Sequence, residues 1–250
     1  MVYFRVIPIL LIDNEECYKI IQFKKKIYIG DPINIIKIFN DIGVDEIIIL
    51  DISKNQEINL NFLNKISGES FVPLTYGGKI KNLFDVENVL SLGFEKISLN
   101  SLLFDNLSMV DKIIKEFGSS TINISVNIKK NLFGEYKIYD YRNKNNTHHD
   151  FKKFLKKIQD LYPGEILITF VNNDGMKNGF DLQFLQKLRS IINCNMLVYG
   201  GLSSENEILK IKEIGMEGVC GSSIFCFSDK QDSVLINYLS EKIKSKIYGI

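Results

Sequence analysis

Tyr76-Gly77-Gly78 and, one apolar run later, Ser98-Leu99-Asn100-Ser101 form a pattern that returns near the other end of the chain as Tyr199-Gly200-Gly201 and Gly221-Ser222-Ser223. Each Gly-Gly pair ends a short apolar run, and each small polar cluster ends the next one. Backbone amides left accessible by glycine, followed one strand–helix unit later by hydroxyl or amide side chains, are typical of a phosphate cradle. Two such cradles predict a ligand with a phosphate group at each end.

Apolar, β-branched runs recur along the whole chain, with amphipathic segments between them. Runs that are continuously apolar indicate parallel strands buried on both faces. The expected strands are Arg5–Ile12, Glu46–Asp51, Val72–Thr75, Lys96–Asn100, Thr121–Ile128, Ile166–Val171, Asn195–Val198 and Gly218–Gly221. The expected helices include Ile33–Ile42, Leu83–Leu92, Met109–Phe117, Phe151–Leu161, Leu182–Ile192, Glu205–Ile214 and Val234–Ile243. Eight strand–helix units in 250 residues predict an α/β fold, a single (β/α)8 TIM barrel.

Three landmarks repeat at a nearly constant spacing. Glu46 and Glu165 are 119 residues apart, the two Gly-Gly pairs are 123 apart, and the serines Ser101 and Ser223 are 122 apart. Such a spacing favours an internal repeat. We therefore expect one domain, residues 1–250, built of two similar half-barrels, about 1–118 and 119–250.

The bulk composition excludes several classes of function. A net charge of +1 gives no electrostatic attraction to nucleic acid or to an anionic membrane. The four cysteines lack metal-ligand spacing and no secretion signal precedes them, which favours reduced thiols in a cytoplasmic protein. In the polar stretch 140–150, the expected mobile insertion, His148-His149 is interpreted as loop surface and not as a metal site. We expect no metal and no organic cofactor.

Several segments together resemble the cyclase (synthase) subunit of imidazole glycerol phosphate synthase, from histidine biosynthesis. They run from residue 5 to about residue 227 and include Arg5-Val6-Ile7-Pro8, Gln22-Phe23, Gly30-Asp31-Pro32, Leu50-Asp51-Ile52, Pro73-Leu74-Thr75-Tyr76-Gly77-Gly78, Asn173-Asp174-Gly175 and Ser222-Ser223-Ile224-Phe225. The resemblance implies a barrel that binds a bisphosphate aminoimidazole ribonucleotide at its carboxyl-terminal face. It also implies a class I glutaminase docked at the amino-terminal face, which sends ammonia through the barrel.

The resemblance carries a set of site residues over to this chain. Contacts to one phosphate are expected from Gly78, Asn100 and Ser101, and to the other from Asp174, Gly175, Gly200, Gly201, Ser222 and Ser223. A ring of four charged residues at the barrel floor, the family's ammonia gate, carries over completely as Arg5, Glu46, Lys96 and Glu165. With Glu95 it would form the glutaminase docking face. The alternative interpretation is a salt-bridge plug that only closes the barrel.

The family's two catalytic aspartates are missing. Leu11 and Asn127 occupy their positions, and neither side chain can exchange a proton at neutral pH. A positioned acid or base contributes ~10²–10⁴-fold in rate, so their loss weighs against an efficient cyclase. Asn172 also replaces a usual carboxylate.

Other residues could take part in the chemistry. Asp13 and Asp51 could substitute for a lost aspartate, and Lys19 matches a functional lysine of the first active-site loop. Lys79 replaces a cradle glycine, where it could either contact a phosphate or block the pocket; a cation beside an anion cradle favours the contact.

The chain is closest in pattern to divergent paralogues of this subunit from surface-polysaccharide gene clusters. In those clusters a glutaminase, such a barrel and a sugar amidotransferase are thought to make an acetamidino sugar. The leading hypothesis is therefore an ammonia-handling barrel for acetamidino-sugar or lipopolysaccharide biosynthesis. The alternatives are a genuine subunit of histidine biosynthesis and a non-catalytic scaffold that only activates the glutaminase.

Overall fold

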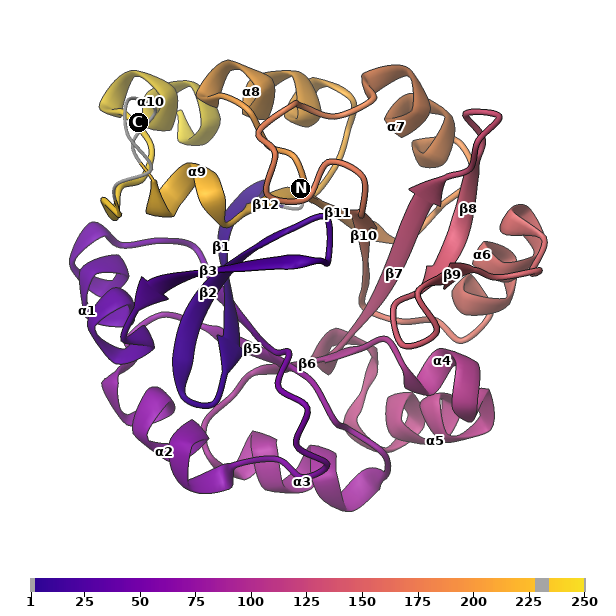
Figure 1. Ribbon diagram of the computed structural model, residues 1–250, viewed down its shortest axis with the longest axis horizontal. Helices are drawn as coiled ribbons and strands as arrows, with labels where there is room; N and C mark the ends of the chain where they lie inside the picture. The colour runs from indigo at the N-terminus through magenta and orange to yellow at the C-terminus, as the bar shows by residue number, and fades with distance from the viewer. Residues whose placement is uncertain (1–2, 228–233, 250) are drawn as a thin grey trace.

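Eight parallel strands close into a barrel in the computed structural model, which describes residues 3–227 and 234–249. The strand order is β10-β11-β12-β1-β4-β5-β6-β7, and β7 pairs back with β10 to complete the circle (Figure 1). The strands are β1 (Arg5–Asp13), β4 (Ile47–Asp51), β5 (Leu74–Gly77), β6 (Lys96–Leu99), β7 (Ile122–Lys130), β10 (Glu165–Phe170), β11 (Asn195–Tyr199) and β12 (Gly218–Gly221). The predicted single (β/α)8 barrel is confirmed.

Helices surround the barrel on all sides (Figure 1). They are α1 (Pro32–Ile42), α2 (Leu60–Glu69), α3 (Leu83–Ser91), α5 (Leu107–Phe117), α6 (Phe151–Gln159), α7 (Leu182–Arg189), α8 (Glu205–Glu213) and α10 (Glu241–Tyr248). Two short helices, α4 (Leu102–Asp105) and α9 (Ser223–Cys226), follow the small polar clusters, and a 3-10 turn (Ser119–Thr121) precedes β7. Helix α2 was not among the segments named from the sequence, although Asn59 caps its first turn at Phe62.

The helix expected over Val234–Ile243 is wrong at its start. Val234 instead forms an isolated bridge with Phe227, and the amides of Leu235 and Asn237 donate to carbonyls of α9. Helix α10 begins only after Ser240, whose amide and hydroxyl both donate to the Glu205 carboxylate. Tertiary hydrogen bonds thus hold this segment outside a helix.

Two groups of antiparallel strands extend from the barrel at its carboxyl-terminal face. Strands β2 (Glu16–Ile21) and β3 (Lys25–Gly30) form an antiparallel hairpin on β1, in a region where no strand is expected from the sequence. Figure 1 shows this hairpin reaching across the barrel opening. Strand β8 (Tyr136–Asp140) pairs with β7, and the short β9 (Asn145–Asn146) with β8, so part of the expected insertion 140–150 is paired backbone.

The buried apolar residues form two clusters with different roles. The larger cluster fills the layer between strands and helices and contains Tyr76. The smaller one fills the barrel interior with Ile7, Ile9, Leu11, Ile48, Leu167, Leu197, Tyr199 and Cys220. The two Tyr-Gly-Gly motifs are therefore not equivalent, because Tyr76 points outward and Tyr199 inward. The division into two half-barrels stays a prediction.

Candidate functional site

Four charged side chains cross the barrel floor. Arg5 begins β1, Lys96 begins β6, Glu165 begins β10, and Glu46 precedes β4 directly. The Arg5 guanidinium bridges Glu46 and Glu165, and Lys96 Nζ lies 3.1 Å from Glu46 and 3.2 Å from Glu165. The structure thus brings together the four residues expected to form the ring, with each carboxylate paired to both cations.

A second layer of polar side chains holds the two carboxylates. Thr75 Oγ1 donates to Glu46 at 2.6 Å, and Asn123 Nδ2 donates to Glu165 at 3.1 Å. Burial would raise the pKa of Glu165, but Arg5 and Lys96 outweigh it and lower this pKa. Sequence reasoning missed Thr75 and Asn123. The signal for Thr75 is a polar residue in an apolar strand, and the signal for Asn123 is the alternation of Asn123, Ser125 and Asn127 with apolar residues.

An apolar column rises above the ring. It is the inner cluster defined above, and Leu11, only 4% exposed, lies in it. The position of the first lost aspartate is therefore part of the barrel lining.

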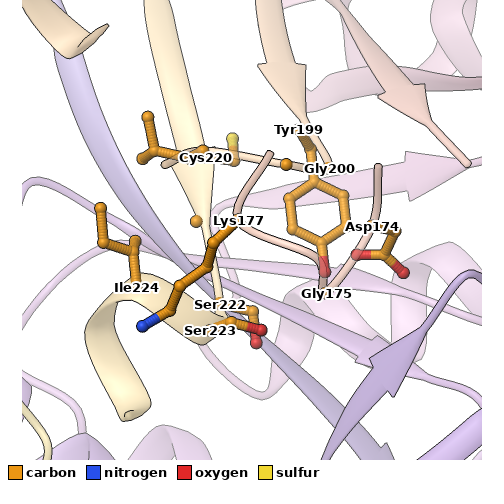
Figure 2. A pocket seen from close by; sticks show the side chains of 12 residues that line it. Asp174, Gly175, Lys177, Tyr199, Gly200, Cys220, Ser222, Ser223 and Ile224 are labelled. Atoms are coloured by element: carbon orange, nitrogen blue, oxygen red, sulfur yellow. The ribbon is translucent and has the colours of Figure 1, made fainter. Parts of the chain in front are cut away.

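One expected phosphate cradle lines a cavity of about 250 Å³, counting the space open to solvent. Its lining includes Asp174, Gly175, Lys177, Tyr199, Gly200, Gly201, Ser222 and Ser223 (Figure 2). Side chains are excluded from its wall: a Cβ on Gly201 would lie 2.6 Å from Asn173 Cβ, and one on Gly175 only 2.1 Å from the Ile20 carbonyl oxygen. All six residues expected at this cradle therefore lie together.

The other expected cradle is more occupied by internal contacts. Lys79 adopts φ 59°, in the left-handed region that favours glycine, and its Nζ lies 2.6 Å from both Asp51 Oδ2 and Ser53 Oγ. Asn100 donates to the Ser125 carbonyl at 2.6 Å, and Ser101 Oγ lies 2.9 Å from the Tyr141 hydroxyl. The phosphate contacts predicted for Gly78, Lys79, Asn100 and Ser101 stay predictions.

The expected substitutes for the lost aspartates are both ion-paired. Asp13 pairs with Lys26 of β3, and Asp51 pairs with Lys79. Asn127 is buried and donates a long hydrogen bond of 3.5 Å to Asn100. Because each of these two carboxylates is bound to a lysine, neither is available to accept a proton from a substrate.

Asp174 is the carboxyl group whose surroundings are unusual. Its side chain is buried, and its Oδ2 has no hydrogen-bond partner among the described residues. The same holds for Tyr199 Oη and Ser222 Oγ, and Figure 2 shows the tyrosine hydroxyl pointing toward the carboxylate. Burial raises the pKa of Asp174 to about 7, against the opposing effects of Tyr199, the Gly175 amide and Lys19. Sequence reasoning did not single out Tyr199.

Lys19 lies on β2, in the hairpin that contacts the loop carrying Asp174 and Gly175. It is buried, with Nζ 4.7 Å from the centre of the Phe227 ring, and its charge favours the ionised form of Asp174. The hairpin is held there by Gln22, whose amide donates to the Asp174 carbonyl and whose side chain donates to the Asn172 carbonyl.

Comparison with known proteins gives matches over nearly the whole chain. The model of the family described as "Histidine biosynthesis protein" matches residues 5–231. This chain belongs to that family. Within it, the chain is 35% identical to a Vibrio vulnificus protein over 97% of this chain and 95% of that protein, and 34% identical to one from Pseudomonas aeruginosa over 95% and 96%. Their names assign them only provisionally as imidazole glycerol phosphate synthase subunits hisF3 and hisF2.

A third relative carries a firmer name. The imidazole glycerol phosphate synthase subunit HisF of Dictyoglomus turgidum is 31% identical over 95% of this chain and 96% of that protein. The resemblance predicted from the sequence is thus confirmed, and the chain is a divergent cyclase-type member of the family. No helix in residues 3–227 and 234–249 is long and apolar enough to cross a membrane.

Proposed function

We propose that this barrel receives ammonia from a class I glutaminase docked at its amino-terminal face and delivers or uses it at the opposite face. The acceptor is a phosphorylated or sugar substrate, in acetamidino-sugar and surface-polysaccharide biosynthesis in the cytoplasm. A sugar amidotransferase is the expected third component. The observation that carries this proposal is the complete ring of Arg5, Glu46, Lys96 and Glu165 beneath an apolar column.

The ring has the chemistry of a gate. Each buried carboxylate is bound by two cations, so one cation can swing away and still leave each carboxylate paired, which limits the cost of an uncompensated buried charge. Above the ring, Ile7, Ile9 and Ile48 line a column where an ion would be strongly disfavoured. Neutral ammonia suits such a column and the ammonium ion does not.

The opposite face supports an anionic acceptor. The Gly175–Gly201 cavity has glycine walls and two buried serines, Ser222 and Ser223, at its base. Small residues and hydroxyl donors allow close approach of a phosphate group.

The proposal is tested in the complex of this chain with its glutaminase. Lys96→Met removes one gate cation and keeps most of the side-chain volume, and Lys115→Met on exposed α5 is the matched control. We expect Lys96→Met to hydrolyse glutamine within about twofold of the wild-type rate while several-fold more of the ammonia escapes to solvent, where a coupled dehydrogenase detects it. If Lys96→Met releases no more ammonia to solvent than the wild type does, the result favours the scaffold alternative and contradicts the conduit.

The second candidate is a genuine cyclase subunit of histidine biosynthesis. The D. turgidum relative, matched over nearly its whole length, favours it, while Leu11 and Asn127 oppose it. The cyclisation rate of the purified protein with ammonium chloride and the aminoimidazole ribonucleotide distinguishes the two candidates. Rapid cyclisation would contradict the sugar proposal. If only substrate binding persists, Leu11→Asp with Asn127→Asp should raise the cyclisation rate. Absence of ribonucleotide binding would contradict the predicted phosphate sites.

A further inference from the structure

Three buried polar atoms without hydrogen-bond partners in the described part of the chain gather at one cavity. They are Asp174 Oδ2, Tyr199 Oη and Ser222 Oγ, and the ammonia path described above uses none of them. Asp174 and Tyr199 face each other and the hydroxyl favours the ionised carboxyl, so these two groups satisfy one another in part. A buried polar group without a partner costs about 1–3 kcal/mol, and the incomplete pairing of three such groups in one place indicates a site built to meet a ligand.

The cavity also adjoins the apolar column. Tyr199 and Cys220 belong both to the inner apolar cluster and to the cavity lining. Ammonia that rises through the column therefore arrives beside the Tyr199 hydroxyl, with the Asp174 carboxyl next to it (Figure 2).

Pairing of the strands places this site close to a lost aspartate. Asn127 of β7 is the partner of Thr169 in β10, and Thr169 is the partner of Tyr199 in β11. Partners in adjacent parallel strands share a face, so Tyr199 lies two strands from position 127 on the interior face.

Other carboxylates at this end of the barrel are already committed. Asp13 is paired with Lys26, Asp51 with Lys79 and Asp181 with Lys130, whereas one oxygen of Asp174 has no partner among the described residues.

We propose that Asp174 and Tyr199 form the proton-transfer site of this barrel, in place of the aspartates lost at positions 11 and 127. The proposal rests on the proposed function, because ammonia supplies the proton to be moved. The acceptor class is a phosphorylated compound with an electrophilic carbonyl or imine carbon, its phosphate at Ser222 and Ser223.

The proton balance of the step is simple. The lone pair of ammonia forms a C–N bond to the electrophilic carbon, and the C=O or C=N π pair moves to its oxygen or nitrogen. The new ammonium group then loses one proton to the Asp174 carboxylate, directly or through Tyr199 Oη, which accepts one proton as it donates its own. Protonated Asp174 returns that proton to the oxygen or nitrogen that received the π pair.

The surrounding charges suit a group that changes protonation. Lys19 faces Asp174 from β2, Lys177 lies in the same loop as Asp174, and Cys220 and Cys226 face Tyr199 from β12 and α9. Burial raises the pKa of both thiols, which keeps them neutral. With the pKa of Asp174 raised to about 7, acid and base forms are both populated near neutral pH.

The first test follows the carboxyl group itself. Carbon-13 NMR of protein labelled at aspartate carboxyls, from pH 5 to 9, should show one carboxyl titrating near pH 7 that Asp174→Asn removes. Tyr199→Phe should raise its midpoint, because the hydroxyl favours the ionised form. Inorganic phosphate should raise the wild-type midpoint too, since a nearby anion disfavours ionisation. An Asp174 carboxyl that stays ionised from pH 5 to 9 overturns the proposal.

The second test measures turnover of two probe acceptors with ammonium chloride. One is the aminoimidazole ribonucleotide; the other is a nucleotide-linked N-acetylated sugar, assayed with the sugar amidotransferase and ATP, which activates the amide oxygen for departure. Asp174→Asn should lower kcat by about 100-fold or more with KM for the acceptor little changed, and Asp111→Asn on α5 is the charge-matched control. A full wild-type rate in Asp174→Asn overturns the proton-transfer site even if the gate test succeeds. A failed gate test with the carboxyl titration intact overturns the conduit alone.

Discussion

At the scale of single residues, burial of Asp174 links stability to pH. The pKa of this carboxyl is raised to about 7, whereas in the unfolded chain it is near 3.8. The folded protein keeps this proton up to a higher pH than the unfolded chain does. The Asp174 carboxyl therefore destabilises the fold increasingly as pH rises from about 4 to 7, and by a constant amount above pH 7. Asp174→Asn should therefore stabilise the protein at pH 8 by roughly 1–4 kcal/mol, at ~1.4 kcal/mol per pKa unit.

Urea unfolding at pH 4 and pH 8 measures this effect. The gain from Asp174→Asn should fall below ~1 kcal/mol at pH 4, where the folded carboxyl is protonated and only about half of the unfolded chains carry the charge. A gain that is equal at both pH values would show that the carboxyl is not destabilised by its surroundings.

Lys79 combines an unfavourable backbone with a favourable ion pair. Lys79→Met should lower the free energy of unfolding because Asp51 loses its cation while largely buried. Lys79→Gly loses the same ion pair but removes the strain of the left-handed backbone at φ 59°. That strain costs a residue with a Cβ about 1 kcal/mol. The glycine variant should therefore be the more stable of the two by about that amount in urea unfolding; the reverse order would contradict the assigned strain.

Site residues could be predicted where a motif requires a particular residue type. They could not be predicted where strand register decides whether a side chain points into the barrel or out of it. The resemblance to the cyclase subunit supplied the ring and the Gly175–Ser223 cradle residues, and the structure brings both sets together. The sequence could not separate Tyr76 from Tyr199, since inward or outward orientation depends on a one-residue difference in strand register. Tyr199 was missed for that reason.

At the scale of elements, the β2–β3 hairpin rests directly on the loop after β10. Gly175 has φ 72°, and an added Cβ would lie 2.1 Å from the Ile20 carbonyl oxygen of β2. Gly175→Ala should therefore displace the hairpin, weaken phosphate binding and destabilise the protein by about 2–4 kcal/mol.

Gly43→Ala is the matched control, because Gly43 has φ 73° with open space around its Cβ position. It should lose only about 1 kcal/mol, the cost of left-handed backbone alone. Hydrogen exchange of the β2 and β3 amides separates the two variants: faster exchange is expected in Gly175→Ala only. Equal exchange in both would contradict the hairpin contact.

The β2–β3 hairpin is absent from the strands expected from the sequence because neither of its strands is a continuous apolar run. Its residues alternate in burial, with Cys17 and Lys19 buried between more exposed neighbours, and that period of two is the signal for an antiparallel strand with one covered face. The misplaced start of α10 has a different cause: hydrogen bonds to α9 and to Glu205 outweigh local helical propensity.

At the scale of the whole molecule, the barrel followed from eight apolar runs spaced by helical segments, since few other topologies bury parallel strands on both faces. The structure shows the order of features along the barrel: a ring of paired charges lies at one end, an apolar column lies above it, and a polar cavity lies at the other end. That order matches transfer of a neutral molecule from one face to the other.

Isotope tracing of nitrogen through the complex tests this account most directly. The barrel, its glutaminase and the ATP-dependent sugar amidotransferase are given [amide-15N]glutamine, ATP, a nucleotide-linked N-acetylated sugar and an excess of unlabelled ammonium chloride; ATP activates the amide oxygen for departure. Mass spectrometry of the amidinated sugar should show mainly 15N, because ammonia crosses the barrel without mixing with solvent, and Lys96→Met should dilute the label. A label that matches the bulk ammonium pool in the wild-type complex would contradict the conduit.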